Sequence, residues 1–192
     1  MPKKILVILG QPQRQSYGGA LAQAYIDGAK QAGAEVKELY LGDLKFNPCA
    51  AGGPPTGELE PELLHAQAAI KWAEHLVFVY PIWWGTIPAL LKGFIERVFL
   101  PGFAVNFRKN SPLWDKLLSG RSARLIVTLN TPSWVYRWYF GRPGHNTMKK
   151  TILQFCGITP VRITEIGPIK DSTEEKRKKW LQQVHLLGTE QS

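Results

Sequence analysis

Short, nearly unbroken aliphatic runs alternate along most of this chain with segments that have helical spacing. Strands that are buried on both faces of a parallel sheet have such continuous apolar sequences, whereas half-exposed strands alternate apolar with polar residues. The sheet of this chain should therefore be covered by helices on both faces. The predicted strands are Lys3–Leu9, Glu35–Leu41, His75–Tyr80, Arg124–Leu129 and Val161–Ile166.

Predicted helices separate these strands. Apolar residues spaced three and four apart begin at Leu21 and stop before Gly33, and Pro61 can open the next helix at its first position. Strands that alternate with helices through right-handed crossovers predict one α/β domain over residues 1–192, with a flavodoxin-like parallel sheet of order 2-1-3-4-5. The remaining helices are predicted at Ala89–Phe99, as a short helix beginning at Ser111–Asp115, at Asn146–Phe155, and after the capping box Ser172–Glu175.

Composition and charge narrow the class of protein. With 44% apolar and 20% charged residues the chain is typical of a globular protein, and no transmembrane segment is expected. Two cysteines, Cys49 and Cys156, are too few for a disulfide framework and fit no metal-ligand pattern, so we expect a reducing, cytoplasmic compartment and no metal. The net charge is +9, but its densest run, Glu174–Lys179, contains its own acids and is typical of a solvated helix face. No nucleic-acid partner is expected.

Three loops of unusual composition follow the first, third and fourth predicted strands. In an open α/β sheet, ligands bind beyond the carboxyl ends of the strands, where the strand order reverses, and these three loops converge there. The first loop, GQPQRQSYGG, precedes a helix whose unsatisfied amides attract anions. Two interpretations remain open: Arg14, Ser16 and the glycines Gly18 and Gly19 form a phosphate cradle, or Ser16 only caps the helix.

The second and third loops are rich in aromatic residues. Trp83 and Trp84 follow a buried strand, so they either pack in the core or form a wall for a flat aromatic ligand. The loop Asn130–Gly144 holds five more aromatic side chains, which indicate burial against a partner subunit, a planar ligand or a local cluster. Tyr136 and His145 are the candidates for a proton-transfer role, with a purely structural role as the alternative.

The segment PIWWGTIPALLKGFIERVFLPGFA resembles the NAD(P)H:quinone oxidoreductases of the DT-diaphorase type. In that family the third strand ends in a proline, a tryptophan follows three residues later, and Pro-Ala opens a helix that reads LKG-aromatic-x-E-R-V-F. An R-x-S-aromatic pattern at Arg14–Tyr17, FNP at Phe46–Pro48 and FCG at Phe155–Gly157 also agree. The residues that match in the long segment are Pro81, Trp84, Pro88, Ala89, Leu91, Lys92, Gly93, Phe94, Glu96, Arg97, Val98 and Phe99.

This resemblance implies a flavin-dependent enzyme in which NAD(P)H gives a hydride to a non-covalent flavin and a quinone-type acceptor then takes it. It implies FAD, with FMN as the alternative, and a homodimer with its flavin sites at the interface. By resemblance, Ser16–Gly18 would hold the flavin phosphates, while Pro81–Trp84 and Asn130–Pro132 would contact the ring. Tyr136 and His145 are the candidate catalytic residues. The expected cofactor-binding residues are Gln11, Arg14, Ser16, Tyr17, Gly18, Pro81, Ile82, Trp83, Trp84, Gly85, Asn130, Thr131 and Pro132.

The chain departs from the family pattern at several positions. Gln11 stands where the family often has histidine, Gly18 stands where it often has asparagine, and LNTP replaces the usual TTGG of the third loop. The family's tyrosine corresponds to Tyr136, whereas its downstream histidine has no aligned equivalent and His145 only lies near that position. The irregular segment Gly42–Pro61, the expected dimer-contact loop, should decide whether the adenine end of FAD is held.

Three other functions remain open from the sequence. A flavodoxin-type electron carrier would bind FMN without turning over NAD(P)H, and the PxxWxxxPAxLKG helix and the aromatic third loop argue against it. A regulatory accessory subunit of a membrane transporter would act mainly by binding its partner. A basic nucleic-acid-binding domain would bind DNA or RNA in a salt-dependent way and would be colourless.

Overall fold

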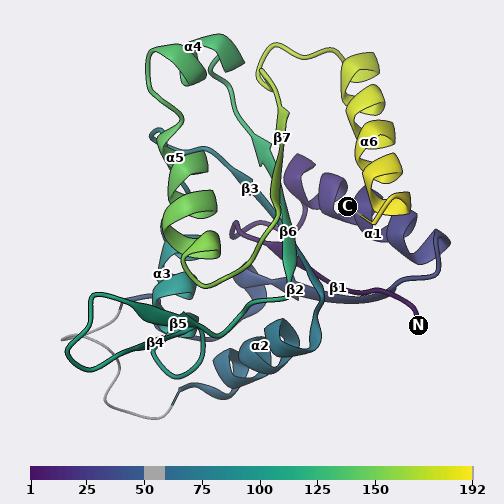
Figure 1. Ribbon diagram of the computed structural model, residues 1–192. Coiled ribbons are helices and arrows are strands. Elements are labelled where there is room, and N and C mark those ends of the chain that lie inside the picture. The colour runs from purple at the N-terminus through teal and green to yellow at the C-terminus, as the bar shows by residue number, and fades with distance from the viewer. Residues whose placement is uncertain (50–58, 192) are drawn as a thin grey trace.

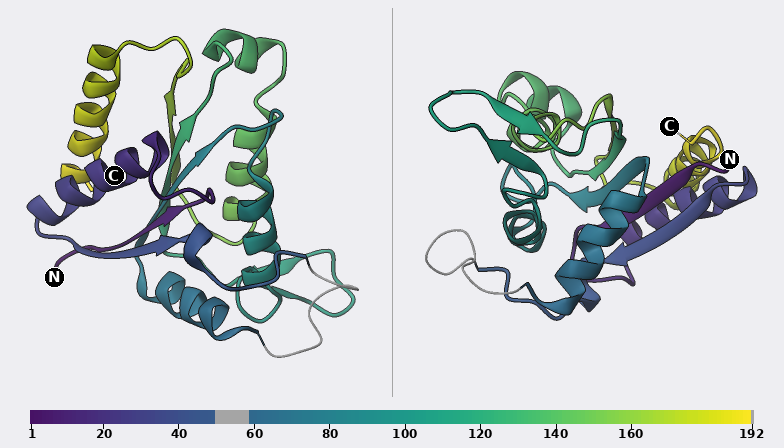
Figure 2. Two further views of the ribbon diagram at one scale, coloured as in Figure 1. Left: turned by 180° about the vertical axis from the view of Figure 1, so that it is seen from behind. Right: turned by 60° about the horizontal axis from the view of Figure 1, so that its bottom comes forward.

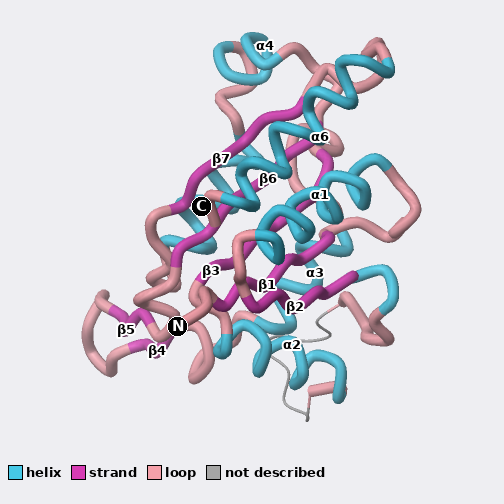
Figure 3. Tube along the Cα trace, turned by 90° about the vertical axis from the view of Figure 1, so that its right-hand side faces the viewer, coloured by secondary structure: helices cyan, strands magenta, loops and turns pink. Residues whose placement is uncertain are grey.

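The computed structural model describes residues 1–49 and 59–191 and contains a five-stranded parallel sheet at its centre (Figure 1). The strands lie side by side in the order β2-β1-β3-β6-β7, which can be followed in Figure 3. This confirms the predicted order 2-1-3-4-5, because β4 (Val105–Phe107) and β5 (Trp114–Lys116) form a separate antiparallel pair. The strands of the sheet are β1 (Lys4–Leu9), β2 (Glu35–Tyr40), β3 (His75–Pro81), β6 (Ser122–Thr128) and β7 (Val161–Ile166).

Helices cover both faces of the sheet, as the aliphatic runs predict (Figure 2). One face packs against α1 (Tyr17–Gln31) and α6 (Glu174–Thr189). The other packs against α2 (Pro61–Trp72), α3 (Ala89–Val98) and a π-helical segment, η2 (Thr147–Gln154). Successive side chains of a strand point to opposite faces. The central strand β1 therefore needs apolar residues at consecutive positions, with Ile5 and Val7 on the α1 side and Leu6 and Ile8 on the other.

Two glycines allow α1 and α6 to cross closely. A Cβ atom placed on Gly28 would lie 2.1 Å from the carbonyl oxygen of His185, and one placed on Gly188 would lie 2.2 Å from that of Tyr25. Both obstacles are backbone atoms, so no side-chain rotation can relieve the overlap. The two glycines thus set the distance between the helices, and with it the depth of the apolar layer on this face.

The predicted short helix at Ser111–Asp115 is wrong. Trp114 and Asp115 belong to strand β5, and Ser111 accepts a hydrogen bond from the Leu113 amide in a turn. The reason is tertiary. The Trp114 indole stacks on Phe155 with ring centroids 4.3 Å apart and donates its N–H to the Phe155 carbonyl at 2.8 Å, which ties this segment to η2's end.

The start of the last helix differs by one residue from the prediction. Thr173, not Ser172, is the N-cap of α6, and its hydroxyl accepts a hydrogen bond from the Lys176 amide. Ser172 instead accepts from the Arg177 side chain and donates to a carbonyl. The charged run Glu174–Lys179 is exposed except for the half-buried Arg177. It carries two ion pairs, each between residues one helical turn apart, which confirms the solvated helix face.

Two segments predicted as irregular are partly ordered. The loop Asn130–Gly144 contains the short helix α4 (Ser133–Trp138), and α5 (Pro143–Asn146) leads into η2. At the start of the segment Gly42–Pro61, residues Leu41–Asp43 form one 3-10 turn, η1. Residues 50–58 lie outside the described residues, so the predicted role of this segment in holding the adenine end of FAD is untested. No helix in the described part of the chain is long and apolar enough to cross a membrane.

Candidate active site

The three predicted ligand-binding loops leave the sheet beside one another. The Gly10 amide donates to the Val79 carbonyl at 2.8 Å, which holds the loop after β1 against the end of β3. The Ile82 amide donates to the Thr128 carbonyl at 2.7 Å, which holds the loop after β3 against the end of β6. These hydrogen bonds continue the strand pairing beyond the sheet, so all three loops lie at the carboxyl ends of the strands, as the topology requires.

A cavity of about 530 Å³ opens between the second and third loops. A smaller one, of about 120 Å³, shares Ile82, Leu129 and Asn130 with it and is also lined by Pro81, Trp83, Thr128 and Ile169. The first loop lines neither cavity, and Pro132 only precedes α4 as its N-cap. The structure thus unites the second and third predicted loops around one space. The residues lining the larger cavity are Ile82, Trp84, Gly85, Leu129, Asn130, Thr131, Tyr136, Phe140 and Pro143.

A tight turn from Trp83 to Thr86 forms one wall of the larger cavity. The amides of Trp83 and Thr86 donate to each other's carbonyls at 3.0 and 3.1 Å. Trp84 and Gly85 between them have φ values of 49° and 79°, the left-handed pair of a type I′ turn. A tryptophan in this conformation is strained, and its side chain is fully exposed at 102%. The turn therefore displays Trp84 at the rim, outside the core.

The turn also decides which amides can bind a ligand. Those of Ile82 and Trp83 are used inside the protein, by Thr128 and Thr86. The amides of Trp84 and Gly85 have no acceptor within residues 1–49 and 59–191. Two free N–H groups beside an exposed indole suit the polar edge of a planar heterocycle, whose face can stack on the indole.

Tyr136 is buried behind this turn, with 2% of its side chain exposed. Its hydroxyl donates to the Gly85 carbonyl at 2.9 Å and accepts from the Gly144 amide at 3.0 Å. Burial raises the pKa of Tyr136, so the hydroxyl stays protonated at neutral pH. Tyr136 thus links the second loop to the third while its side chain lines the cavity.

His145 lies behind Tyr136 and does not line the cavity. Its ring meets that of Tyr136 edge-on, with centroids 5.1 Å apart, and its Nε2 lies 3.0 Å from a Glu165 carboxylate oxygen. The same oxygen lies 3.4 Å from the Arg142 guanidinium. Burial lowers the pKa of His145 more than the Glu165 charge raises it, so the imidazole is neutral at pH 7. Its Nδ1 has no partner among the described residues.

In the first loop Ser16 is the N-cap of α1. Its hydroxyl accepts from the Gly19 amide at 3.0 Å and donates to the Gln13 carbonyl at 2.9 Å, so it caps α1. The Gln11 amide also donates to this hydroxyl and to the Gln13 carbonyl. A Cβ on Gly18 would meet the Gln11 side chain at 2.8 Å. Ser16, Gln11 and Gly18 therefore shape the loop, and the Ser16 hydroxyl is directed to the Gln13 carbonyl.

The remaining groups of the first loop still suit an anion. The amides of Tyr17 and Gly18, at the first turn of α1, have no acceptor in the described segments. The half-exposed Arg14 lies over the Tyr40 ring at 3.9 Å, with Asp43 3.8 Å away. The Tyr17 side chain points elsewhere, since its hydroxyl donates to the Arg177 carbonyl on α6. Two helix-terminal amides and a nearby guanidinium are the donors that a phosphate group requires.

Sequence reasoning missed two charged residues, Arg142 and Glu165. Glu165 is the only acid in β7 and lies near the carboxyl end of that strand, which was a usable signal. Arg142 carried no local signal, because its approach to Glu165 depends on a left-handed backbone at φ 53° after Gly141 at φ 68°.

Comparison with known proteins places the chain in a family. The model of the family described as "Flavodoxin-like fold" matches residues 3–185. A ribosyldihydronicotinamide dehydrogenase-like protein of Penicillium crustosum is 29% identical over 66% of this chain, which spans 57% of that protein's length. NAD(P)H dehydrogenase (quinone) 1 of Rattus norvegicus is 26% identical over 86% of this chain and 70% of the length of the rat protein.

Solved structures agree with the sequence comparisons. A protein from Streptococcus mutans is 30% identical and superimposes with a TM-score of 0.84 over 97% of this chain and 98% of that one. An FMN-dependent NADH-azoreductase from Bacillus anthracis, solved with FMN, has a TM-score of 0.74 over 100% and 99% of the two chains, but at 17% identity it supports only the fold. With its parallel sheet, its converging loops and a match over nearly its whole length, the chain belongs to the flavodoxin-like family that includes the NAD(P)H:quinone oxidoreductases.

Proposed function

We propose that this protein is a flavin-dependent NAD(P)H oxidoreductase that reduces a quinone or a similar small acceptor in the cytoplasm. The observation that carries the proposal is the aromatic cavity at the carboxyl ends of β3 and β6, with the free Trp84 and Gly85 amides on its wall. A bound flavin would supply the hydride chemistry, and the protein would supply binding, orientation and electrostatics. The relatives named for quinone and dihydronicotinamide chemistry support the same class.

The residues fit a flavin in two places. The free amides of Tyr17 and Gly18, with Arg14 nearby, would hold the phosphates. The Trp84 and Gly85 amides would donate to the ring's polar edge, and Asn130–Pro132 would approach it from the third loop. Ser16 and Gln11 would act indirectly, by fixing the shape of the first loop. FAD is the proposed cofactor, with FMN as the alternative.

Tyr136 and His145 are the proposed proton-handling residues. The Tyr136 side chain reaches the cavity wall, and His145 stands behind it on Glu165. The neutral, buried imidazole and the protonated phenol can hold a proton close to the acceptor without adding charge to an apolar site.

Replacing Tyr136 by phenylalanine is expected to slow acceptor reduction by about 100-fold, the lower end of the usual contribution of a positioned proton donor. Flavin should remain bound. Because the pKa of Tyr136 is raised, the wild-type rate should show no titration of this group between pH 6 and 9, a window in which its folded and unfolded forms are both protonated. Stopped-flow reduction of a quinone by the NADPH-reduced protein measures the effect. A variant as fast as wild type would remove Tyr136 from proton handling.

A homodimer is proposed from the aromatic surface around the cavity. Trp134, Trp138, Tyr139 and Phe140 are 53–81% exposed on and just after α4, and Trp84 joins them from the opposite loop. A cluster of exposed aromatic rings at the mouth of a cavity is typical of a surface that another chain covers.

Replacing both Trp138 and Tyr139 by serine is expected to convert the dimer to a monomer with an unchanged fold. The reason is that both rings are exposed in the single chain and contribute little to its core. Sedimentation velocity and far-UV circular dichroism measure the two properties. The matched control is Leu113→Ser, which removes a similarly exposed apolar side chain, 59% exposed, from the β4–β5 hairpin. A monomeric wild type would reject the dimer.

The experiment that tests the proposed function is an absorbance spectrum of the protein reconstituted with FAD or FMN, followed by anaerobic NADPH or NADH. Flavin bands that bleach support a reductase. Bands that form but do not bleach would instead favour an electron carrier or a transporter's accessory subunit. The absence of flavin uptake would reject the proposal.

A further inference from the structure

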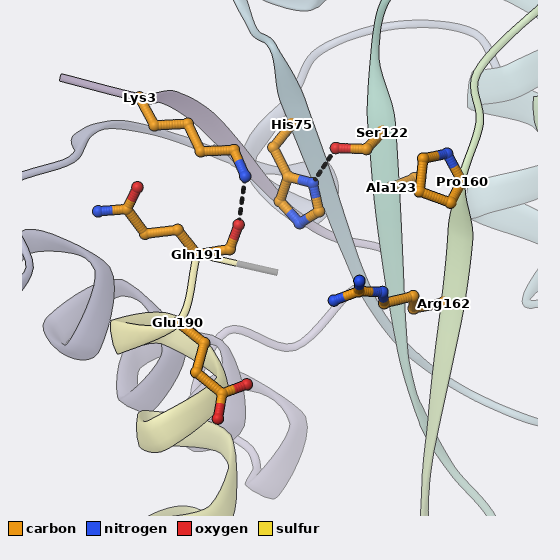
Figure 4. Close-up of a pocket in the computed structure, with 8 residues that line it drawn as sticks. All are labelled: Lys3, His75, Ser122, Ala123, Pro160, Arg162, Glu190 and Gln191. Atoms are coloured by element: carbon orange, nitrogen blue, oxygen red, sulfur yellow. Dashed lines mark hydrogen bonds between the residues drawn. The ribbon is translucent and has the colours of Figure 1, made fainter. Parts of the chain in front are cut away.

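A separate cavity lies at the opposite end of the sheet from the candidate active site. It has a volume of about 370 Å³ and is formed where β1, β3, β6 and β7 begin, beside the C-terminal end of α6 (Figure 4). It shares no lining residue with the two active-site cavities. The polar residues around this amino-end cavity are Lys3, His75, Ser122, Arg162, Glu190 and Gln191.

His75 presents an unused polar atom to the amino-end cavity. Its side chain is 2% exposed, and its Nδ1 lies 2.7 Å from the Ser122 hydroxyl. We assign the Ser122 hydroxyl as the donor to Nδ1, since it has no other acceptor in the described segments, and this assignment puts the proton of the neutral ring on Nε2. Nε2 has no partner among the described residues and points into the space between Lys3, Gln191 and Arg162 (Figure 4). The Nε2–H of His75 therefore points into the cavity without an acceptor among the described residues.

The charges around His75 are mainly positive. Burial, followed by the charges of Lys3, Arg124 and Arg162, lowers the pKa of His75 to about 3, so the ring is a neutral donor at pH 7. Lys3 donates one hydrogen bond to the Gln191 carbonyl, and its ammonium has two further N–H groups. Among the described lining residues Glu190 is the one acid, and Glu74 lies close enough to raise the pKa of Lys3. Two cations against one carboxylate leave the lining with a net positive charge.

The donors also exclude other classes of ligand. Within residues 1–49 and 59–191, no phenylalanine, tyrosine or tryptophan lines the amino-end cavity, so a stacked heterocycle has no broad aromatic platform there. An imidazole N–H, an ammonium and a guanidinium are all donors without acceptor capacity at neutral pH. Their natural partner is an oxygen with several lone pairs and a negative charge.

We propose that the amino-end cavity binds a small oxyanion, a phosphate or carboxylate group, through the Nε2–H of His75, the ammonium of Lys3 and the guanidinium of Arg162. The anion satisfies the buried His75 nitrogen and neutralises the excess positive charge of the lining. Because this site lies at the other end of the sheet, it does not depend on the proposed flavin chemistry.

The test follows the His75 ring directly. The ¹⁵N-labelled chain, as purified, is titrated at pH 7 and constant ionic strength with inorganic phosphate and, separately, with acetate, while long-range ¹H–¹⁵N correlation records the ring nitrogens of His75. A saturable shift is expected for at least one anion. In Lys3→Gln and in Arg162→Gln the affinity should fall about tenfold, as expected for losing one charge-assisted hydrogen bond. Both variants keep the His75–Ser122 pair.

The matched control is Lys109→Gln, which removes an exposed cation from the β4–β5 hairpin, far in sequence from the cavity lining. Its affinity should equal that of the wild-type protein within about twofold, because a distant exposed charge is screened by salt. Saturation by phosphate alone identifies a tetrahedral anion, and saturation by acetate as well extends the site to carboxylates. A shift that never saturates, or equal affinities in all variants, would overturn the proposal. His75 Nε2 would then be hydrogen-bonded only by water.

Discussion

Replacing Gly28 by alanine is expected to lower the free energy of unfolding by about 2–3 kcal/mol, the upper part of the usual range for forcing extra volume into a close-packed contact. The new methyl group would lie 2.1 Å from the His185 carbonyl oxygen, so α1 and α6 must move apart. In an open helix the same change would stabilise the protein by up to about 1 kcal/mol, because alanine is the better helix former. A loss of stability in Gly28→Ala, rather than a gain, would therefore show that α1 and α6 are in close contact at this position.

Thermal and urea unfolding measure this effect, and Tm should fall by roughly 5–10 °C for a domain of this size. The control on the same helix is Gln23→Ala, at an exposed position, which should change stability by less than about 0.5 kcal/mol. Gly188→Ala should resemble Gly28→Ala, since its methyl group would meet the Tyr25 carbonyl at 2.2 Å. The double variant should lose less than the sum, because helices already separated by one methyl group accommodate the second. A Gly28→Ala protein as stable as wild type would contradict the close crossing.

Replacing Gly85 by valine is expected to weaken flavin binding by about 100-fold, which corresponds to ~2.7 kcal/mol. Gly85 has φ 79°, a conformation that a β-branched residue strongly disfavours. The turn can escape this strain only by changing its conformation. That change would redirect the free Trp84 and Gly85 amides and release the Gly85 carbonyl from Tyr136.

The matched control is Gly102→Val. Gly102 has φ 83°, and an added Cβ there would meet no atom within 4 Å, so the substitution imposes the same backbone strain away from the cavity. Both variants should lose similar stability, about 1–2 kcal/mol for one residue forced into the left-handed region. Only Gly85→Val should lose flavin affinity, measured by titrating the protein into a fluorescent flavin solution. Equal flavin affinities for the two variants would show that the Trp83–Thr86 turn does not bind the cofactor.

Local sequence patterns predicted the sheet and its order correctly. The aliphatic runs are unbroken because a central strand such as β1 buries side chains on both faces, and this requirement acts within a few residues of chain. The converging loops were predicted for the same reason, since parallel strands separated by helices bring their carboxyl ends to one edge. The segment Ser111–Asp115 was predicted wrongly because Trp114 is held by Phe155, which lies 41 residues away.

The sequence by itself determined the parallel sheet, its helical cover and the edge at which a ligand would bind. Hydrophobic periodicity and the alternation of strands with helices depend on residues that are close together in the sequence. Only the tertiary structure decided what each loop residue does. It made Ser16 the N-cap of α1 and paired the amides of Ile82 and Trp83 with carbonyls of the protein. The amides of Trp84 and Gly85 have no acceptor among the described residues. The tertiary structure also placed His75 beside Ser122, 47 residues away. A hydrogen bond needs its partner within about 3 Å in space, and no spacing along the chain specifies which distant group arrives there.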